Sequence, residues 1–307
     1  MEAAEFDDCV LYGGLSGVEL DFAELDLTGG VSIRKIYAHL MTPHIMAFQR
    51  PEKPGGAYGG YWAAVSDGRP HDIHIELRLP NECGAKLDEK VKFAKTVVAL
   101  LRLHASPQFG LPIISNVPIE EAAAHSKKHH FLPVEPAPPF FSVRLKGREI
   151  LSKVHFGWTI DSLTDAIKLN KENEQFAFAL SALDSWQTIR SGPLALVYIW
   201  AALENIFSPD KAPELKFRVA ALIASYLEGP GEQRKQKFKD VGRLYDARSK
   251  AAHGSSTHDV DVLYGTYDLL RKVVMKMIAQ KKVPSKSELE NNLFGEGSPR
   301  LSEVVRA

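Results

Sequence analysis

The segment formed by residues 244–254 combines two side chains that are suited to phosphodiester chemistry. Arg248 and His253 are separated by four residues at the end of a helical pattern, and Gly254 follows where a helix would end. Arginine binds phosphate through its guanidinium, and histidine exchanges protons near neutral pH. The segment therefore predicts a phosphodiester site at Arg248 and His253.

The spacing by itself is a weak signal, because three other pairs have a similar separation: Arg34 and His39, Arg69 and His74, and Arg148 and His155. A helix turns about 100° per residue, so Arg248 and His253 lie about 140° apart and do not share a face. One chain would then form a poor site. A two-fold axis near this helix end would supply two copies of each side chain.

Basic residues are concentrated just before and within this segment. Seven cations between residues 234 and 250 face only Asp240 and Asp246; they are Arg234, Lys235, Lys237, Lys239, Arg243, Arg248 and Lys250. The whole chain is neutral, with 38 Lys+Arg and 38 Asp+Glu, so there is no global attraction to nucleic acid. The basic run is either a solvated helix face or a surface that binds a phosphate backbone.

Structural roles compete with catalysis at both residues. Arg248 could pair with Asp246, Asp240 or Glu204, or bond to carbonyl groups at the helix end. His253 could be a cation that stabilises a helix C-terminus. Burial of Arg248 against a carboxylate would favour these structural roles, whereas a shared basic groove would favour catalysis.

Composition is that of an ordinary folded protein: 307 residues, 45% apolar and 25% charged. Cys9 and Cys83 lack metal-like spacing, and nothing completes a site around the pair His125 and His129, so we predict no metal and no cofactor. The first residues are acidic without an apolar run, and the longest apolar run, residues 194–203, is too short to cross a bilayer. We therefore expect a cytoplasmic protein without a membrane partner.

The periodicity predicts an α+β chain with two domains. Residues 1–150 form a mixed α/β domain, with strands over 31–41, 71–79 and 140–145 and a helix over 90–104. Residues 151–307 form an all-α bundle with helices over 174–189, 194–207, 214–228, 232–253 and 259–282, followed by a tail from residue 289. The helix over 194–207 is apolar nearly all round, which predicts a central position.

The helical half resembles the HEPN superfamily, and within it the ApeA-like HEPN domains of bacteria. The resemblance lies in LVYIWAALENIF at residues 196–207, FRVA at 217–220 and LYDARSKAAHG at 244–254. It covers about residues 155–283, and the order of helices also fits. It implies an HEPN-type helical bundle that dimerises, so that two Arg-x4-His motifs meet in one cleft.

In catalytic HEPN members this cleft is a metal-independent ribonuclease site, and many members are toxins or effectors of defence against phage. The resemblance implies that Arg248 and His253 are catalytic and that RNA is the substrate. Supporting residues are then Ser249, where active members often carry Asn, Asp or His, with Tyr245 and Glu204; the RNA-binding cations are Lys250, Arg243 and Lys239. The alternative is an inactive HEPN module that binds a nucleotide, RNA or a protein. The first domain would sense a trigger or restrain the cleft.

Overall fold

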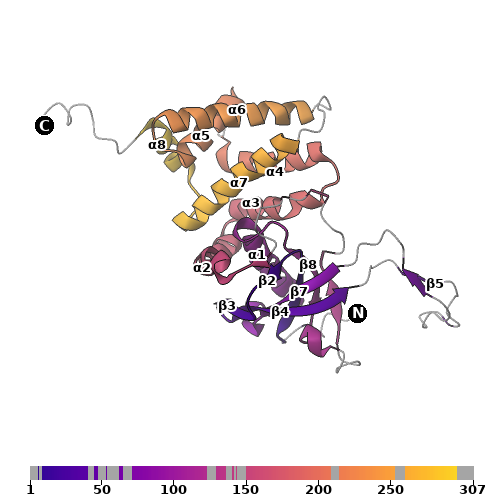
Figure 1. Cartoon of the computed structure of the whole chain (residues 1–307). Coiled ribbons are helices and arrows are strands. Elements are labelled where there is room, and N and C mark those ends of the chain that lie inside the picture. Colours follow the sequence, from indigo (N-terminus) through magenta and orange to yellow (C-terminus); the bar gives the residue numbers. More distant parts are fainter. Residues whose placement is uncertain are drawn as a thin grey trace. The chain divides into compact units, whose positions relative to one another are not determined.

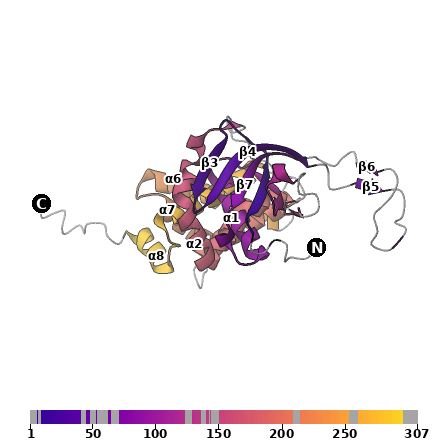
Figure 2. The ribbon, with the colours of Figure 1, turned by 90° about the horizontal axis from the view of Figure 1, so that it is seen from below.

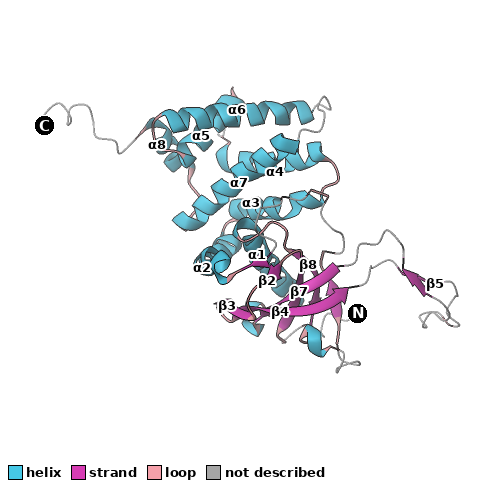
Figure 3. Ribbon diagram, in the orientation of Figure 1, coloured by secondary structure: helices cyan, strands magenta, loops and turns pink. Residues whose placement is uncertain are grey.

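The computed structural model describes residues 6, 9–40, 45–47, 53, 62–64, 71–122, 129–135, 140–141, 143, 150–208, 214–252 and 260–295. The chain divides into two compact units, residues 1–164 and 165–307. The described strands all belong to the first unit, and the second is helical (Figure 3). The predicted α+β class, with an all-helical second half, is confirmed.

Six strands form the main sheet of the first unit, in the order β3–β4–β7–β1–β8–β9, and each is antiparallel to its neighbour. Figure 2 shows β3, β4 and β7 side by side. The strands are β1 (Leu11–Ser16), β3 (Glu24–Thr28), β4 (Val31–Leu40), β7 (His71–Leu79), β8 (Gly110–Ser115) and β9 (Phe131–Pro133). Two short pairs join β2 (Glu19–Leu20) to β10 (Ile150–Leu151) and β5 (Ile45–Ala47) to β6 (Trp62–Ala64).

The alternation predicted for residues 71–79 is confirmed, because the apolar side chains of β7 are almost completely buried; they are Ile73, Ile75, Leu77 and Leu79. The expected strand over residues 31–41 corresponds to β4. The strand expected over 140–145 is wrong at Phe140, Phe141 and Val143, which are not in a strand, and its other residues lie outside the described part of the chain.

Helix α1 (Leu87–His104) contributes Val97, Val98 and Leu101, all fully buried, to the core of the first unit. Its one fully buried ammonium, that of Lys90, donates to three oxygens, namely the carbonyl oxygens of Cys9 (2.7 Å) and Phe6 (3.3 Å) and Oδ1 of Asn81 (2.9 Å). A buried charge needs such partners, so Lys90 ties α1 to the chain before β1.

The second unit consists of helices with clear start signals. Asn173 caps α3 (Glu174–Ser185), and Ser191 caps α4 (Gly192–Phe207), whose first turn contains proline. The remaining helices are α2 (Gly157–Glu172), inside which the two units divide, α5 (Leu215–Leu227), α6 (Glu232–Ala252), α7 (Val260–Gln280) and α8 (Lys286–Phe294). Single turns of 3-10 helix occur at η2 (Asn81–Cys83), η3 (Ile119–Glu121), η4 (Lys153–Phe156) and η5 (Trp186–Thr188).

Helix α4 has the predicted central position, because it contacts α3, α5, α6 and α7 (Figure 1). Trp200 and Phe207 on this helix are fully buried, whereas Leu194 in its first turn is 63% exposed. The five helices predicted for this half are all present. Helices α2 and α8 were not predicted, and α8 is anchored by buried Leu289, while Phe294 is 79% exposed.

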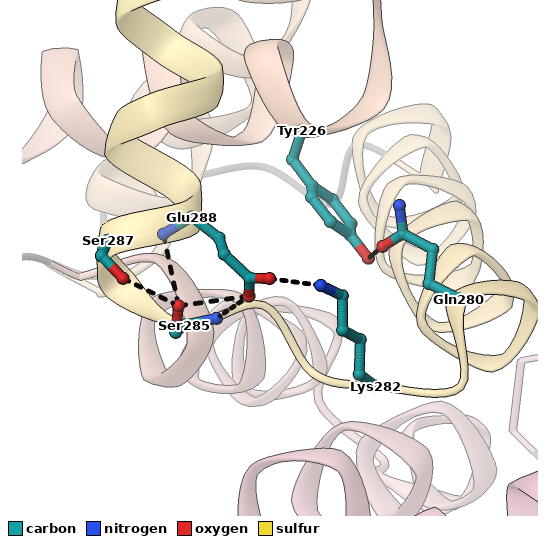
Figure 4. Close-up of polar contacts among 6 residues, drawn as sticks. All are labelled: Tyr226, Gln280, Lys282, Ser285, Ser287 and Glu288. Atoms are coloured by element: carbon teal, nitrogen blue, oxygen red, sulfur yellow. Dashed lines mark hydrogen bonds and ion pairs between the residues drawn. The ribbon is translucent and has the colours of Figure 1, made fainter. Parts of the chain in front are cut away.

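A polar network fastens α8 after the end of α7 (Figure 4). Ser285 and Glu288 form a reciprocal cap, with Glu288 N to Ser285 Oγ at 3.2 Å and Ser285 N to Glu288 Oε2 at 2.9 Å. The same carboxylate forms an ion pair with Lys282. Beside it, the Tyr226 hydroxyl donates to Gln280 Oε1 at 3.0 Å. The ion pair, followed by the Ser285 amide, lowers the pKa of Glu288 to about 2.

Candidate functional site

Helix α6 carries the basic segment and presents one stripe of side chains to the core of the helical unit. Val241 is fully buried and Tyr245, one turn later, is 8% exposed. Arg248 follows three positions after Tyr245, so it continues the same stripe. Because α4 and α5 pack against α6, core packing directs the Arg248 guanidinium toward α4.

Arg248 forms a half-buried ion pair with Glu204 of α4. Its Nη2 lies 3.0 Å from Glu204 Oε2, and the two side chains are 26% and 19% exposed. The guanidinium carbon lies 5.7 Å from the centroid of the Tyr245 ring, which meets the buried Trp200 ring edge-on at 5.0 Å. Two aromatic rings therefore support the ion pair on its inner side.

The ion pair leaves part of each side chain unsatisfied. Nε of Arg248 and Oε1 of Glu204 are buried without a hydrogen-bond partner among the described residues. Buried polar atoms of this kind are uncommon in proteins. A guanidinium has five donors, and this one keeps about a quarter of its side chain exposed, so a phosphate oxygen could bind Arg248 while Glu204 stays in place.

Tyr245 contributes a neutral phenol to this cluster. Burial raises the pKa of Tyr245 above its ordinary value, and the charge of Glu204 and a hydrogen bond to it raise the pKa further, while Arg248 lowers it. The phenol therefore keeps its proton at physiological pH. Of the predicted supporting residues, the structure brings Glu204 and Tyr245 to Arg248.

The other predicted site residues lie elsewhere. His253 and Gly254 lie outside the described residues. Ser249 is half-buried beside Arg248 on α6. The three predicted RNA-binding cations point about 140° to 180° away from Arg248 around the helix axis; they are Arg243, Lys239 and Lys250.

Two of those cations border a groove between α5 and α6, called here the α5–α6 groove, with a volume of about 580 Å³. Its lining includes Lys216, Phe217, Phe238, Lys239, Arg243 and Asp246. Asp246 binds Lys216 at 2.6 Å, and Asp240 lies 3.4 Å from Arg243, so neither of these carboxylates is the partner of Arg248.

The sequence predicted the cations Lys239 and Arg243 but not the aromatic part of this groove. Phe217 is 57% exposed although it belongs to an amphipathic helix. The periodicity of a helix shows that one side is apolar, but it does not show which apolar residue lies at the edge of the buried stripe. The exposed ring is visible only once α5 and α6 are packed.

No group of three or more His, Cys, Asp or Glu side chains in the described residues could hold a metal ion. His125 of the candidate histidine pair lies outside the described residues. The centroids of the His129 and Phe131 rings are 5.4 Å apart. Among the described helices, none combines the length and the apolar character that a membrane span requires.

Comparisons with models of known families, with curated proteins and with solved structures found no match.

Proposed function

We propose that the helical unit is a metal-independent ribonuclease of the HEPN type that acts as a homodimer. The observation that carries the proposal is the placement of Arg248, which core packing holds in the last turns of α6, five positions before His253. The order of α4, α5, basic α6 and α7 supports it, because it follows the order of helices in the resemblance. RNA is the substrate class because the chemistry uses a ribose 2′-hydroxyl.

In this mechanism, Arg248 binds the scissile phosphate and stabilises the negative charge that builds up on it. His253 takes the proton of the 2′-hydroxyl, and the 2′-oxygen attacks phosphorus. The bond from phosphorus to the 5′-oxygen breaks, that oxygen takes a proton from water, and protonated His253 returns its proton to the solvent. The products carry a 2′,3′-cyclic phosphate and a 5′-hydroxyl. Glu204 is a positioning residue that orients the guanidinium.

One observation favours a second candidate, an inactive binding module of the same fold. Glu204 already pairs with Arg248 within one chain, and a paired guanidinium attracts a phosphate less strongly than a free one. Such a module would bind a nucleotide, RNA or a protein partner without cleaving it. The two candidates differ in whether RNA is cut when Arg248 and His253 are intact.

The test is cleavage of end-labelled transfer and messenger RNA in excess EDTA by the wild type, Arg248→Ala and His253→Ala. We expect cyclic-phosphate ends from the wild type and a loss of about 100-fold or more in each variant. Arg271→Ala is the matched control, because Arg271 is 24% exposed and pairs with Asp268 on α7. Equal cleavage by all proteins would refute the assignment of both residues, and RNA binding without cleavage by the wild type would establish the binding module.

A further inference from the structure

The α5–α6 groove lies on the opposite side of α6 from Arg248. We propose that this groove binds a single nucleic-acid strand, with a base stacked on Phe217 and phosphates held by Lys239 and Arg243. Binding there is independent of base sequence and of the sugar. The proposal rests on the proposed function only in naming RNA as the natural ligand.

Phe217 provides the stacking surface. Its side chain is 57% exposed, and its ring meets that of Phe238 edge-on, with centroids 5.4 Å apart and an interplanar angle of 71°. An edge-on neighbour fixes a ring without covering it completely. Stacking of bases on exposed aromatic rings is a general means of holding single strands, because every base has a flat face.

Cations surround this ring. Lys239 is exposed and has no ion pair among the described residues, and the Arg243 side chain is 77% exposed, with Asp240 at the longer distance of 3.4 Å. Lys216 neutralises Asp246, the one carboxylate among the described residues of the lining. The lining therefore keeps an excess of positive charge next to the aromatic surface, which suits the alternating bases and phosphates of a strand.

The lining also indicates what the groove does not recognise. Among the described residues that line it, none has a neutral hydroxyl or amide side chain that could read a base edge or a 2′-hydroxyl. Its floor is open at Gly242, where an added Cβ would meet only the flexible end of Lys216 at 3.7 Å. A free mononucleotide site would need polar groups that fix the base, so these features favour a strand.

Fluorescence anisotropy with labelled oligo-dT tests the groove without cleavage, because DNA has no 2′-hydroxyl. We expect the wild type to bind oligo-dT and oligo-rU with similar affinity. Phe217→Ala and Phe217→Leu should each weaken binding about tenfold or more, while Phe217→Trp keeps it, because only the flat ring stacks. Phe294→Ala is the control, since it removes a 79% exposed phenylalanine from α8.

The phosphate contact has its own readout in the dependence of binding on salt. Lys239→Gln should reduce the slope of log affinity against log salt concentration by about 0.7, the value for one contact to a single strand. Lys168→Gln, an exposed lysine of α2 that does not line the groove, should leave the slope unchanged. An unchanged slope in Lys239→Gln would remove this lysine from the site.

The proposal is overturned if the wild type binds oligo-rU but not oligo-dT, or if Phe217→Leu binds like the wild type. It is also overturned if Phe217→Ala leaves binding intact but dissociates a dimer in sedimentation, which would make the groove a subunit interface. The two proposals fail separately. Absence of RNA cleavage by the wild type would refute the ribonuclease but not the groove, because oligo-dT binding does not require cleavage. Absence of oligo-dT binding would refute the groove but not the ribonuclease.

Discussion

The ion pair with Glu204 determines how Arg248 can act. Its guanidinium is held by Glu204 and lies against the Tyr245 ring, so its position is determined before any ligand arrives. A prepositioned cation loses little conformational entropy on binding phosphate, but its charge is partly compensated. In the proposed ribonuclease, the same ion pair would help catalysis by orienting Arg248 and would oppose it by compensating part of its charge.

We predict that Glu204 and Arg248 are energetically coupled. Glu204→Gln should lower the free energy of unfolding by about 1 kcal/mol, because it leaves a half-buried guanidinium without its counter-charge. Urea unfolding of the two single variants Glu204→Gln and Arg248→Met and of the double variant measures the coupling, which should be about 1 kcal/mol. Additive effects would show that the ion pair contributes nothing to folding. Lys272→Gln, which breaks an exposed pair with Asp268 on α7, is the control and should change stability little.

At the scale of elements, α6 has two sides with different roles. One side, with Val241 and Tyr245, packs into the unit and carries Arg248, while the other borders the α5–α6 groove through Lys239 and Arg243. Helix α8 in turn contacts α5, one wall of that groove. The cap of α8 at Glu288 therefore helps to stabilise the part of the helical unit that contains α5.

The cap of α8 should respond to acid. Because the pKa of Glu288 falls from its ordinary 4.5 to about 2 on folding, its contribution to stability is present above about 4.5 and is lost as the pH falls toward 2. Glu288→Gln should therefore lower the melting temperature at pH 6 but differ little from the wild type near pH 2.5. Glu290→Gln, an exposed glutamate of the same helix, should show no such pH-dependent difference. A constant difference at both pH values would refute the role of the charge.

At the scale of the whole molecule, the proposed chemistry needs two chains. Helical periodicity predicts that Arg248 and His253 lie on different sides of one helix, so a single chain would offer one cation and one proton carrier in a poor mutual arrangement. A two-fold axis near the end of α6 would supply a second set. The first unit, with its own sheet and core, remains a predicted sensor or restraint of that cleft.

Subunit mixing tests the composite cleft. Arg248→Ala and His253→Ala should each be inactive, and a mixture that has been unfolded and refolded together should recover RNA cleavage, because about half of randomly assorted dimers contain one intact arginine and one intact histidine. Sedimentation of the wild type should show a dimer. A mixture as inactive as its components, with mixed dimers demonstrated, would mean that each chain needs both residues of its own.

The class of the fold and most of the helices could be predicted from local patterns in the sequence. Apolar periodicity and capping residues are local properties, and they located the central α4 and the basic α6 correctly. Strand β1 was missed because it contains Gly13 and Gly14, which are poor strand formers. These glycines are explained only by packing, since an added Cβ at Gly13 would lie 2.9 Å from Leu111 and one at Gly14 would lie 2.9 Å from Ile73.

The surroundings of the candidate site residues could not be predicted from the sequence, because they depend on how the helices pack. The sequence offered Asp240, Asp246 and Glu204 as partners of Arg248 and had no means of choosing among them. The partner is Glu204, 44 residues away on α4, and the nearer carboxylates bind other cations. The exposed Phe217 is a similar case. Periodicity acts within one helix, whereas ion pairs and grooves depend on how two helices are packed, which is a non-local property of the chain.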